Sequence, residues 1–315
     1  MENMLLSLSL VFPMIFMMTV GYILKKAKIV DDHSLGVMNK VQFRAFMSLL
    51  IFYNIYELPS GSLSNQSNFF LIGYTLILIV VEMTVSYAVY SRMTNDPKKI
   101  PVMIQGTYRT NLVIFGMSIA QFLFGDGNVG PTVILVSTIV PLFNVIAVIL
   151  LEVYRGGKVN VKKILVEVLK NPLIVGAVLG MICIIFKIKI PKMIMSPVIS
   201  MSKVATPLAF VILGGSLTLK SIMKNMKYLI AVNFVRLFFI PILAMGIGIK
   251  LGFRDQTLIA LFGVSATPAA VSSFNMAKDM GADGDLAAEI VVTTSLISIL
   301  TTFLWIFLLK NYGLI

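Results

Sequence analysis

The chain has 315 residues, of which 58% are hydrophobic and only 13% are charged. Soluble domains are closer to half apolar and a quarter charged, so the composition excludes an ordinary water-soluble fold and indicates lipid as the solvent. The formal net charge of +12 would suggest a nucleic-acid partner in a soluble protein, but here the basic residues gather in loops between apolar segments, and no nucleic acid is expected.

Four segments lack Asp, Glu, Lys, Arg and His altogether: 3–24, 128–151, 256–277 and 290–309. Each is long enough to cross a membrane, because ~30 Å of hydrocarbon takes about 20 helical residues. The first segment has no basic stretch before it and no A-x-A site after it, so we expect a retained helix rather than a signal peptide. With the hydropathy and helix breakers of the remaining chain, the sequence predicts ten transmembrane helices, over 4–25, 34–57, 68–92, 101–124, 129–153, 171–187, 193–219, 227–250, 255–279 and 284–310.

The loops of the first half differ sharply in charge. Loops 59–67 and 125–128 contain no Lys or Arg, whereas the loops after the first, third and fifth helices carry Lys25, Lys26, Lys28, Arg92, Lys98, Lys99, Arg155, Lys158, Lys162, Lys163 and Lys170. Because basic loops face the cytoplasm, residues 154–170 are predicted to form a cytoplasmic loop, and both termini are predicted outside a cytoplasmic membrane. The second half is less clear, since Lys187, Lys189 and Lys192 fall on the outer side.

The two halves of the chain resemble each other in sequence. A shift of 159 residues places Pro13 and Gly21 over Pro172 and Gly180. A shift of 157 residues makes further matches: Gly106 with Gly263, Thr110 with Thr267, Asn111 with Pro268, and Asp126 with Asp283. Both shifts are near half the chain length. Five helices per repeat is an odd number, so the sequence predicts inverted repeats over 1–153 and 171–315, an arrangement typical of secondary transporters. Chance similarity between apolar segments is the alternative.

The fourth and ninth predicted helices place small and polar residues near the middle of a span. Pro268 removes a backbone donor there, and unwound backbone at that depth must be buried by protein or reached by water. The N-terminal ends of half-helices carry partial positive charge, so two breaks that meet at the midplane predict an anion site. An ordinary proline kink is the alternative. The candidate substrate-binding residues are Arg109, Thr110, Asn111, Ser118, Gln121, Thr267, Pro268, Ser273 and Asn275.

Three of the charged residues inside predicted spans are candidates for a functional role. Arg109 directly precedes the first break, where it either forks onto a substrate carboxylate or anchors the helix at the membrane interface. Glu82 and Arg236 lie midway in the third and eighth helices, and they either pair with each other or line the cavity. The single Cys183 and the single His33 argue against a disulfide and against a metal site, so no metal and no cofactor are expected.

The chain resembles the auxin efflux carrier family, which includes plant PIN auxin exporters and bacterial malate permeases. The resemblance covers nearly the whole chain, and its main segments are Tyr108-Arg109-Thr110-Asn111, Ala266-Thr267-Pro268-Ala269-Ala270-Val271, Asp283-Gly284-Asp285-Leu286-Ala287-Ala288 and Thr206-Pro207-Leu208-Ala209. In two places the chain departs from the family, since Ser118 and Ser48 stand where family members often have proline.

This resemblance implies an all-α fold like those of bile-acid symporters and sodium–proton antiporters. Helices 1, 2, 6 and 7 would form a scaffold, usually dimeric, and helices 3–5 and 8–10 would form a transport domain in which broken helices 4 and 9 cross. It also implies an elevator-like movement of the transport domain.

We therefore expect a secondary transporter for a small organic anion, either an auxin-like or a malate-like carboxylate, bound at the crossover of helices 4 and 9. The sequence contains no G-x-x-x-x-G-K-[ST], so ATP is not the expected driver, and no H-E-x-x-H or G-x-S-x-G, so no enzyme is expected. An ion-coupled symporter of another anion and a membrane-embedded sensor or receptor without net flux are the alternatives.

Overall fold

The computed structural model describes residues 2–57, 66–125, 129–155, 166, 170, 172–216 and 219–315. In these ranges the regular elements are helices, with one isolated antiparallel bridge between Thr110 and Ala269. The loop residues Asp126, Lys158, Lys162 and Lys163 lie outside the described residues. The helices are α1 (Glu2–Lys26), α2 (Asp32–Val41), η1 (Gln42–Phe46), α3 (Met47–Tyr56), α4 (Gln66–Tyr90), α5 (Ile100–Tyr108), η2 (Leu112–Gly116), α6 (Met117–Phe124), α7 (Gly130–Tyr154), α9 (Pro172–Ile185), α10 (Lys192–Ser216), α11 (Leu219–Phe234), η4 (Val235–Phe239), α12 (Ile240–Lys250), α13 (Asp255–Ser265), α14 (Val271–Asp279) and α15 (Gly284–Asn311).

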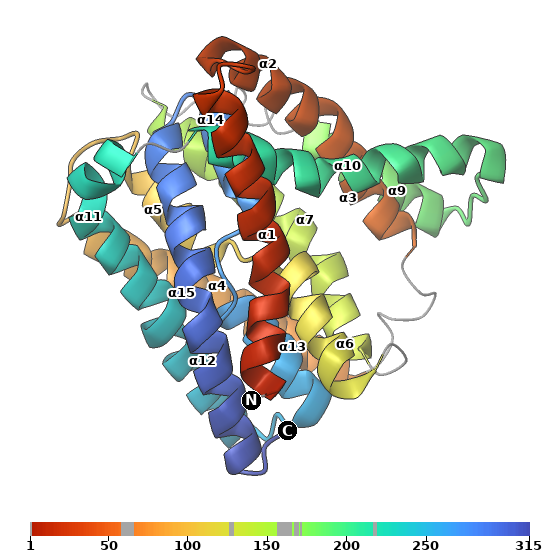
Figure 1. Cartoon of the computed structure of the whole chain (residues 1–315). Helices are drawn as coiled ribbons and strands as arrows, with labels where there is room; N and C mark the ends of the chain where they lie inside the picture. The colour runs from red at the N-terminus through yellow and green to blue at the C-terminus, as the bar shows by residue number, and fades with distance from the viewer. Residues whose placement is uncertain are drawn as a thin grey trace.

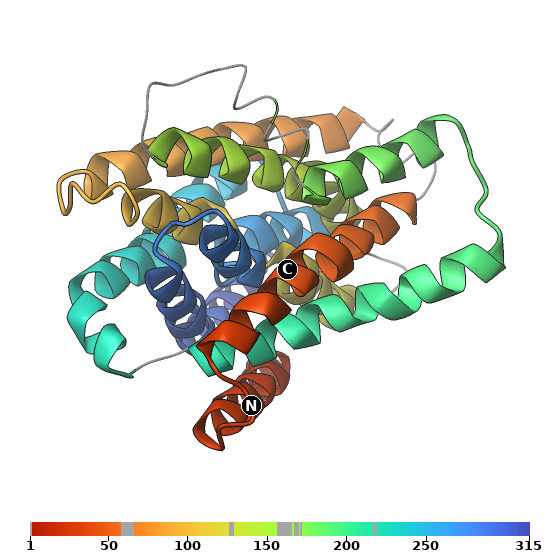
Figure 2. The same cartoon turned by 90° about the horizontal axis from the view of Figure 1, so that it is seen from above.

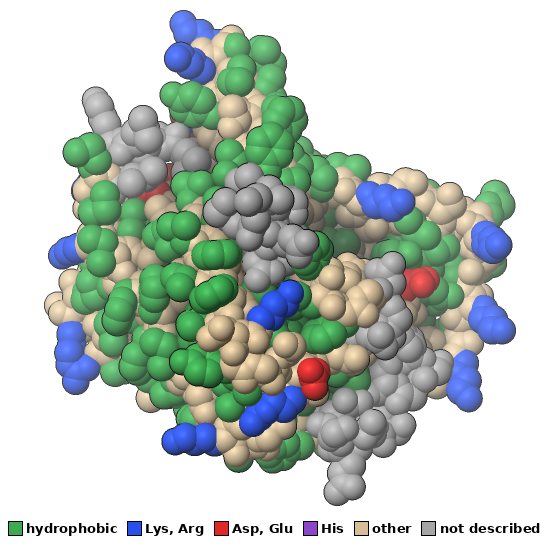
Figure 3. Space-filling view, turned by 60° about the horizontal axis from the view of Figure 1, so that its bottom comes forward, with side chains coloured by type: hydrophobic (Ala, Val, Ile, Leu, Met, Phe, Trp, Pro, Cys, Tyr) green, Lys and Arg blue, Asp and Glu red, His purple; other side chains and the backbone are tan. Residues whose placement is uncertain are grey.

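The described helices confirm an all-α, multi-pass membrane protein. By length and composition, six stretches of them are suited to crossing a membrane: Asp32–Tyr53, Phe69–Tyr90, Gly130–Tyr154, Lys192–Ser216, Met223–Lys250 and Gly284–Asn311. Two shorter apolar stretches, Leu112–Phe124 and Pro172–Ile185, accompany them. Hydrophobic side chains cover much of the face in Figure 3, as expected of a surface that meets lipid, and many of the Lys and Arg side chains stand toward its outline while others lie nearer its middle.

The helix boundaries follow the hydropathy closely, with two instructive interruptions. The segment predicted as one helix over 101–124 ends at Tyr108 and resumes at Leu112, and the segment predicted over 255–279 ends at Ser265 and resumes at Val271. By contrast, η1 and η4 are π-helical turns inside helices that stay continuous. At the last helix, Asp283 accepts a hydrogen bond from the Leu286 backbone N–H at 2.9 Å and so caps the helix N-terminus.

Helices α1, α3, α9 and α10 pack together through small residues. A Cβ at Gly214 of α10 would stand 1.9 Å from the carbonyl oxygen of Met18 in α1, and a Cβ at Gly176 of α9 would stand 2.4 Å from that of Ser48 in α3. Glycine at these positions lets the backbones approach closely, as is typical where helices meet in lipid. Figures 1 and 2 show α3, α9 and α10 on one side of the molecule and α11 on the other.

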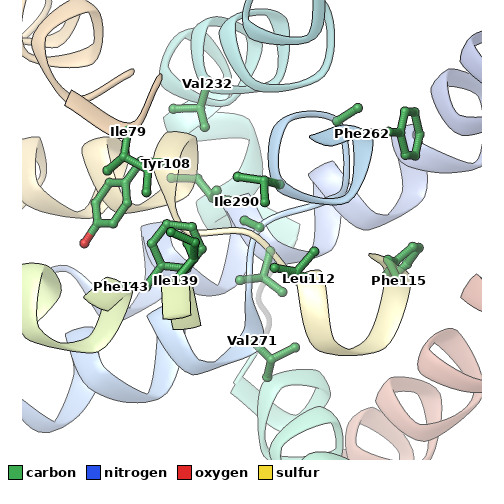
Figure 4. Packing of buried hydrophobic residues seen from close by; sticks show 14 of the residues in the cluster. Ile79, Tyr108, Leu112, Phe115, Ile139, Phe143, Val232, Phe262, Val271 and Ile290 are labelled. Carbon is green, nitrogen blue, oxygen red and sulfur yellow. The ribbon is translucent and has the colours of Figure 1, made fainter. Parts of the chain in front are cut away.

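The main hydrophobic core surrounds the two interrupted helices. Its members include Tyr108 and Leu112 on one interrupted helix and Phe262 and Val271 on the other. Figure 4 shows Leu112 and Val271 beside the crossing segments, with Tyr108 and Phe143 grouped to one side. The Tyr108 and Phe143 rings meet edge to face with centroids 5.6 Å apart, so α5 and α7 are held together next to the break.

Candidate functional site

The two interruptions pair with each other in the middle of the protein. The Asn111 backbone N–H donates to the Pro268 carbonyl oxygen at 2.9 Å, and the Ala270 N–H donates to the Arg109 carbonyl oxygen at 2.9 Å. These bonds form the antiparallel bridge between Thr110 and Ala269. Each unwound segment thus satisfies part of the backbone of the other, which is how irregular backbone is tolerated at membrane depth.

A glycine contact fixes the place where the interrupted helices cross. A Cβ at Gly263 of α13 would lie 3.1 Å from the Gly116 Cα, and a Cβ at Gly116 would lie 3.3 Å from the Gly263 Cα. Hence α13 and the helix that begins at Leu112 touch backbone to backbone. Two helices therefore end and two helices begin within one small region, and their end charges are brought together there.

A cavity of about 80 Å³ lies against this region. It is bounded by both starting half-helices, by α7, and by α3 and α10 from the opposite side. The lining residues are Met47, Leu50, Ile51, Arg109, Thr110, Asn111, Val113, Ile114, Val140, Phe143, Asn144, Thr206, Ala209, Ala270, Val271 and Ser272. A mostly apolar lining with a few polar groups is typical of a site for a small organic molecule.

Arg109 brings a buried positive charge to the cavity. Its side chain is 2% exposed, and it donates to Gln105 Oε1 at 3.2 Å, to Met276 Sδ at 3.4 Å, and to Asn144 Oδ1. All three partners are neutral, and no carboxylate of the described residues forms an ion pair with Arg109. Its burial excludes the interfacial-anchor interpretation. Burying an unpaired charge is costly, so this arginine is suited to receive an anion.

Several polar groups at the cavity lack a partner in the described part of the chain. Thr110 Oγ1 and Asn111 Nδ2 are buried without a hydrogen bond. No described acceptor takes the backbone N–H of Val113, Ile114, Val271 or Ser272, which stand in the first turns of the two starting half-helices. Buried side-chain donors without a partner, such as those of Thr110 and Asn111, are rare in proteins, and free donors around one cavity are what an anion needs.

The pairing of the breaks changes one detail of the expected anion site. The first N–H groups of the half-helices were expected to be free, but those of Asn111 and Ala270 bond the opposite segment. The Ala269 N–H donates to Thr294 Oγ1 at 3.2 Å. The N–H groups of Val113, Ile114, Val271 and Ser272 in the first turns have no described acceptor, so the donors open to a ligand lie beside the bridge rather than within it.

Five other candidate residues, Gln121, Thr267, Pro268, Ser273 and Asn275, do not line the cavity. Thr267 donates its hydroxyl to the Gly263 carbonyl oxygen at 2.7 Å, and Ser273 donates to that of Ala270 at 2.6 Å, so both hydroxyls are already occupied as donors. The Asn275 side-chain amide is buried without a described partner. Gln121 is exposed. Pro268 contributes its carbonyl oxygen to the bridge, and the Ser118 side chain lies outside the described residues.

Sequence reasoning missed the wall of the cavity that faces the breaks. Asn144 of α7, Thr206 of α10 and Met47 of α3 all line it. Asn144 stands in the uncharged segment 128–151, where a lone amide at mid-span is a signal of function that was overlooked. Met47 carries no comparable signal, and Thr206 belongs to a segment of the family resemblance that was not connected with the site, because only the packing of α3 and α10 brings both residues to the cavity.

Arg236 and Glu82 form a second buried group on the other side of the bridge. Their side chains are fully buried, and Arg236 Nη1 lies 4.0 Å from Glu82 Oε1. Arg236 also donates to carbonyl oxygens of Thr107, Val264 and Thr267. Neither residue lines the cavity beside Arg109.

A larger, basic cavity of about 480 Å³ is lined by residues of η1, α7, α9 and α14, and it shares α7 and α14 with the first cavity. Arg44, Arg155 and Lys170 line it together with one acidic residue, Asp279, which is 3.8 Å from Arg44. The buried apolar side chains Phe43, Met47, Val148 and Met276 belong to one hydrophobic cluster on these elements and α3. The surroundings of the larger cavity therefore favour anions.

Comparison with known proteins identifies the family of the chain. The sequence profile of the family described as "Membrane transport protein" matches residues 6–306. An uncharacterized transporter of Methanothermobacter thermautotrophicus is 21% identical over 297 residues, which cover 94% of this chain and 96% of the relative. An uncharacterized transporter of Methanocaldococcus jannaschii is 22% identical over 317 residues, which cover 98% and 100%. The chain therefore belongs to the membrane transport protein family, as its resemblance to auxin efflux carriers predicted, and is a multi-pass membrane transporter.

Proposed function

We propose that this transporter is a secondary carrier of a small organic anion, a carboxylate of auxin-like or malate-like kind, across the cytoplasmic membrane. One observation carries the proposal: the buried Arg109 guanidinium, which has only neutral partners, lines the same cavity as unpartnered donors of Thr110 and Asn111. A carboxylate carries a negative charge that can pair with Arg109 and two oxygens that can accept from the donors of Thr110 and Asn111.

The apolar part of the cavity favours an organic anion over an inorganic one. Leu50, Ile51, Val140 and Phe143 supply apolar side chains to its lining. An inorganic anion would leave these side chains against its own hydration shell, whereas the carbon skeleton of a carboxylate packs against them.

An inverted repeat accounts for the symmetry of the site. We place the first repeat at 1–153 and the second at 171–315, with a cytoplasmic loop at 154–170 and ten transmembrane helices in all. The match of Asn111 with Pro268 supports this, because the two residues are also hydrogen-bonded to each other. Equivalent residues of inverted repeats meet where the pseudo-two-fold axis passes, and the axis runs beside the substrate site in such transporters.

The cavity also lies between the two proposed domains. Met47, Leu50 and Ile51 of α3 and Thr206 and Ala209 of α10 belong to the proposed scaffold, while the Arg109–Asn111 segment and α7 belong to the proposed transport domain. A substrate bound at such a boundary changes side when one domain slides along the other, so we propose an elevator-type alternating access on a homodimeric scaffold.

The basic cavity supports entry from the cytoplasmic side. Arg44, Arg155 and Lys170 lie near the loop with many basic residues, which the positive-inside rule assigns to the cytoplasm, with both termini outside. Basic side chains at a cavity mouth raise the local concentration of anions and speed their capture.

A thermal-shift screen of the purified protein tests the function. Acetate, succinate, malate and indole-3-acetate are compared with chloride at equal ionic strength, and at least one carboxylate should raise the melting temperature, because a ligand at 100 times its Kd adds about 2.7 kcal/mol. The same screen is run on Asn111→Ala, which should show a smaller shift because it lacks one polar contact of the cavity. Its matched control is Asn233→Ala, since Asn233 is a buried asparagine that donates to Thr293 Oγ1 and does not line the cavity. Uptake of the stabilising carboxylate into proteoliposomes then separates a carrier from a sensor without flux, and absence of any carboxylate-specific shift contradicts the proposal.

A further inference from the structure

Arg236 joins the ends of the two half-helices that stop at the break. Its Nη1 donates to the Thr107 carbonyl oxygen at 2.6 Å, in the last turn of α5. Its Nη2 donates to the Val264 carbonyl oxygen at 3.1 Å, in the last turn of α13. Nη2 and Nε donate to the Thr267 carbonyl oxygen just beyond, at 2.7 Å and 2.9 Å. One side chain thus caps the C-terminal ends of both half-helices.

These helix ends need a positive charge. The last carbonyl groups of a helix have no partner within the helix and carry partial negative charge, and here two such ends converge in the protein interior. In transporters with broken helices, this is the position where backbone carbonyls commonly coordinate a coupling cation. The nearby carboxylate of Glu82, 4.0 Å from Arg236 Nη1, would complete a set of oxygen ligands for such an ion.

We propose that Arg236 acts as a built-in cation that occupies this position permanently, so that the site needs no bound sodium or other alkali ion. The guanidinium suits the task because it always carries its charge and presents its donors in a rigid fork that reaches three carbonyl groups at once. A mobile ion must arrive and leave for coupling, whereas Arg236 is tethered and fully buried.

This role also makes Arg236 a positioning residue for the proposed anion site. The Thr107 and Thr267 carbonyls lie within three residues of Thr110 and Ala269, whose bridge orders the cavity wall. The inference that Arg236 helps to order an anion site rests on the proposed function. The inference that Arg236 takes the place of a bound cation rests only on the contacts of Arg236 itself.

The test needs no anionic substrate, so its outcome does not depend on the proposed function. Melting temperatures of purified protein are measured in sodium chloride and in N-methyl-D-glucamine chloride at equal ionic strength. The wild type should melt at the same temperature in both. Arg236→Ala vacates a space ringed by the three carbonyl oxygens and Glu82, so it should lose on the order of 10 °C without sodium. Saturating sodium should restore at least half of that loss.

Two further variants define the site. In the double variant Glu82→Gln with Arg236→Ala, the recovery by sodium should disappear, because the charged ligand is gone. Arg254→Ala is the matched control, since Arg254 also donates to backbone carbonyls but is exposed directly before α13, and it should show no sodium response. Arg236→Lys keeps the charge with fewer donors, so it should be less stable than the wild type and insensitive to sodium.

Several results would overturn the proposal. A sodium-specific rise in the melting temperature of the wild type or of Arg236→Lys would show that a cation binds although the side chain is charged. Loss of stability in Arg236→Ala without recovery in sodium, lithium or potassium would show that no cation position exists. If Arg236→Ala does not fold in any of these salts, the sodium responses of the wild type and Arg236→Lys decide the matter.

Discussion

Replacing Arg109 with glutamine separates substrate binding from folding. The substitution removes the buried charge but keeps an amide donor near Asn144 and Gln105, its neutral partners. The backbone carbonyl of residue 109 still accepts from the Ala270 N–H, so the bridge between the two breaks is retained.

The expected effects on affinity and on stability differ in sign. Removing one partner of a buried charge pair costs about 2–5 kcal/mol, so affinity for a carboxylate should fall between about 30-fold and about 5,000-fold. Without a ligand, the wild type holds a guanidinium that is 2% exposed and has no charged partner in the described residues. Glutamine relieves that desolvation, so the ligand-free melting temperature should be unchanged or higher.

Isothermal titration with the best carboxylate of the screen gives the affinity, and thermal melting of the same preparations gives the stability. Arg254→Gln serves as the control, because it removes an exposed arginine and should change neither value. The reasoning is refuted if Arg109→Gln binds the carboxylate as tightly as the wild type does, or if it melts well below the wild type without ligand.

Four other predictions follow from the same contacts. Asn111→Ala removes one buried polar contact, about 1–3 kcal/mol, and should weaken carboxylate binding roughly 10- to 100-fold in titrations. Pro268→Ala lets the break rewind and should abolish proteoliposome uptake while the protein stays folded by circular dichroism. Gly214→Ala forces a Cβ against Met18 and should lower the melting temperature, whereas Gly246→Ala, with open space around it, should not. On a Cys183→Ser background, single cysteines in loop 154–170 should be labelled in intact cells only by permeant reagents, and labelling by impermeant reagents would contradict the proposed orientation.

Much of the helical layout follows from composition alone. The uncharged segments 128–151 and 290–309 have no stable alternative to a membrane helix, and the observed α7 and α15 extend over them. The interruption at Pro268 follows from the missing proline N–H and from the small residues around it. No proline marks the interruption after Tyr108, so its prediction depended on the match between the two halves.

The details of the site required the three-dimensional structure. The sequence shows that Arg109 is charged, but only the packing of α7 and α14 shows that Asn144 and Met276 bury it. Likewise, hydropathy gives no sign that the two breaks share hydrogen bonds, which remove the Asn111 and Ala270 N–H groups from the ligand. Contacts between residues so far apart in the chain depend on helix packing, and a single sequence does not encode helix packing locally.

Carboxylate uptake by proteoliposomes of known orientation tests the central claim most directly. Radiolabelled malate, succinate and indole-3-acetate are offered to the wild type, Asn111→Ala, Arg109→Gln and the control Asn233→Ala. The site at the paired breaks predicts saturable uptake of at least one anion by the wild type and the control, with a much higher KM or no uptake in the other two variants. Uptake with an unchanged KM in both Asn111→Ala and Arg109→Gln would show that the anion binds elsewhere.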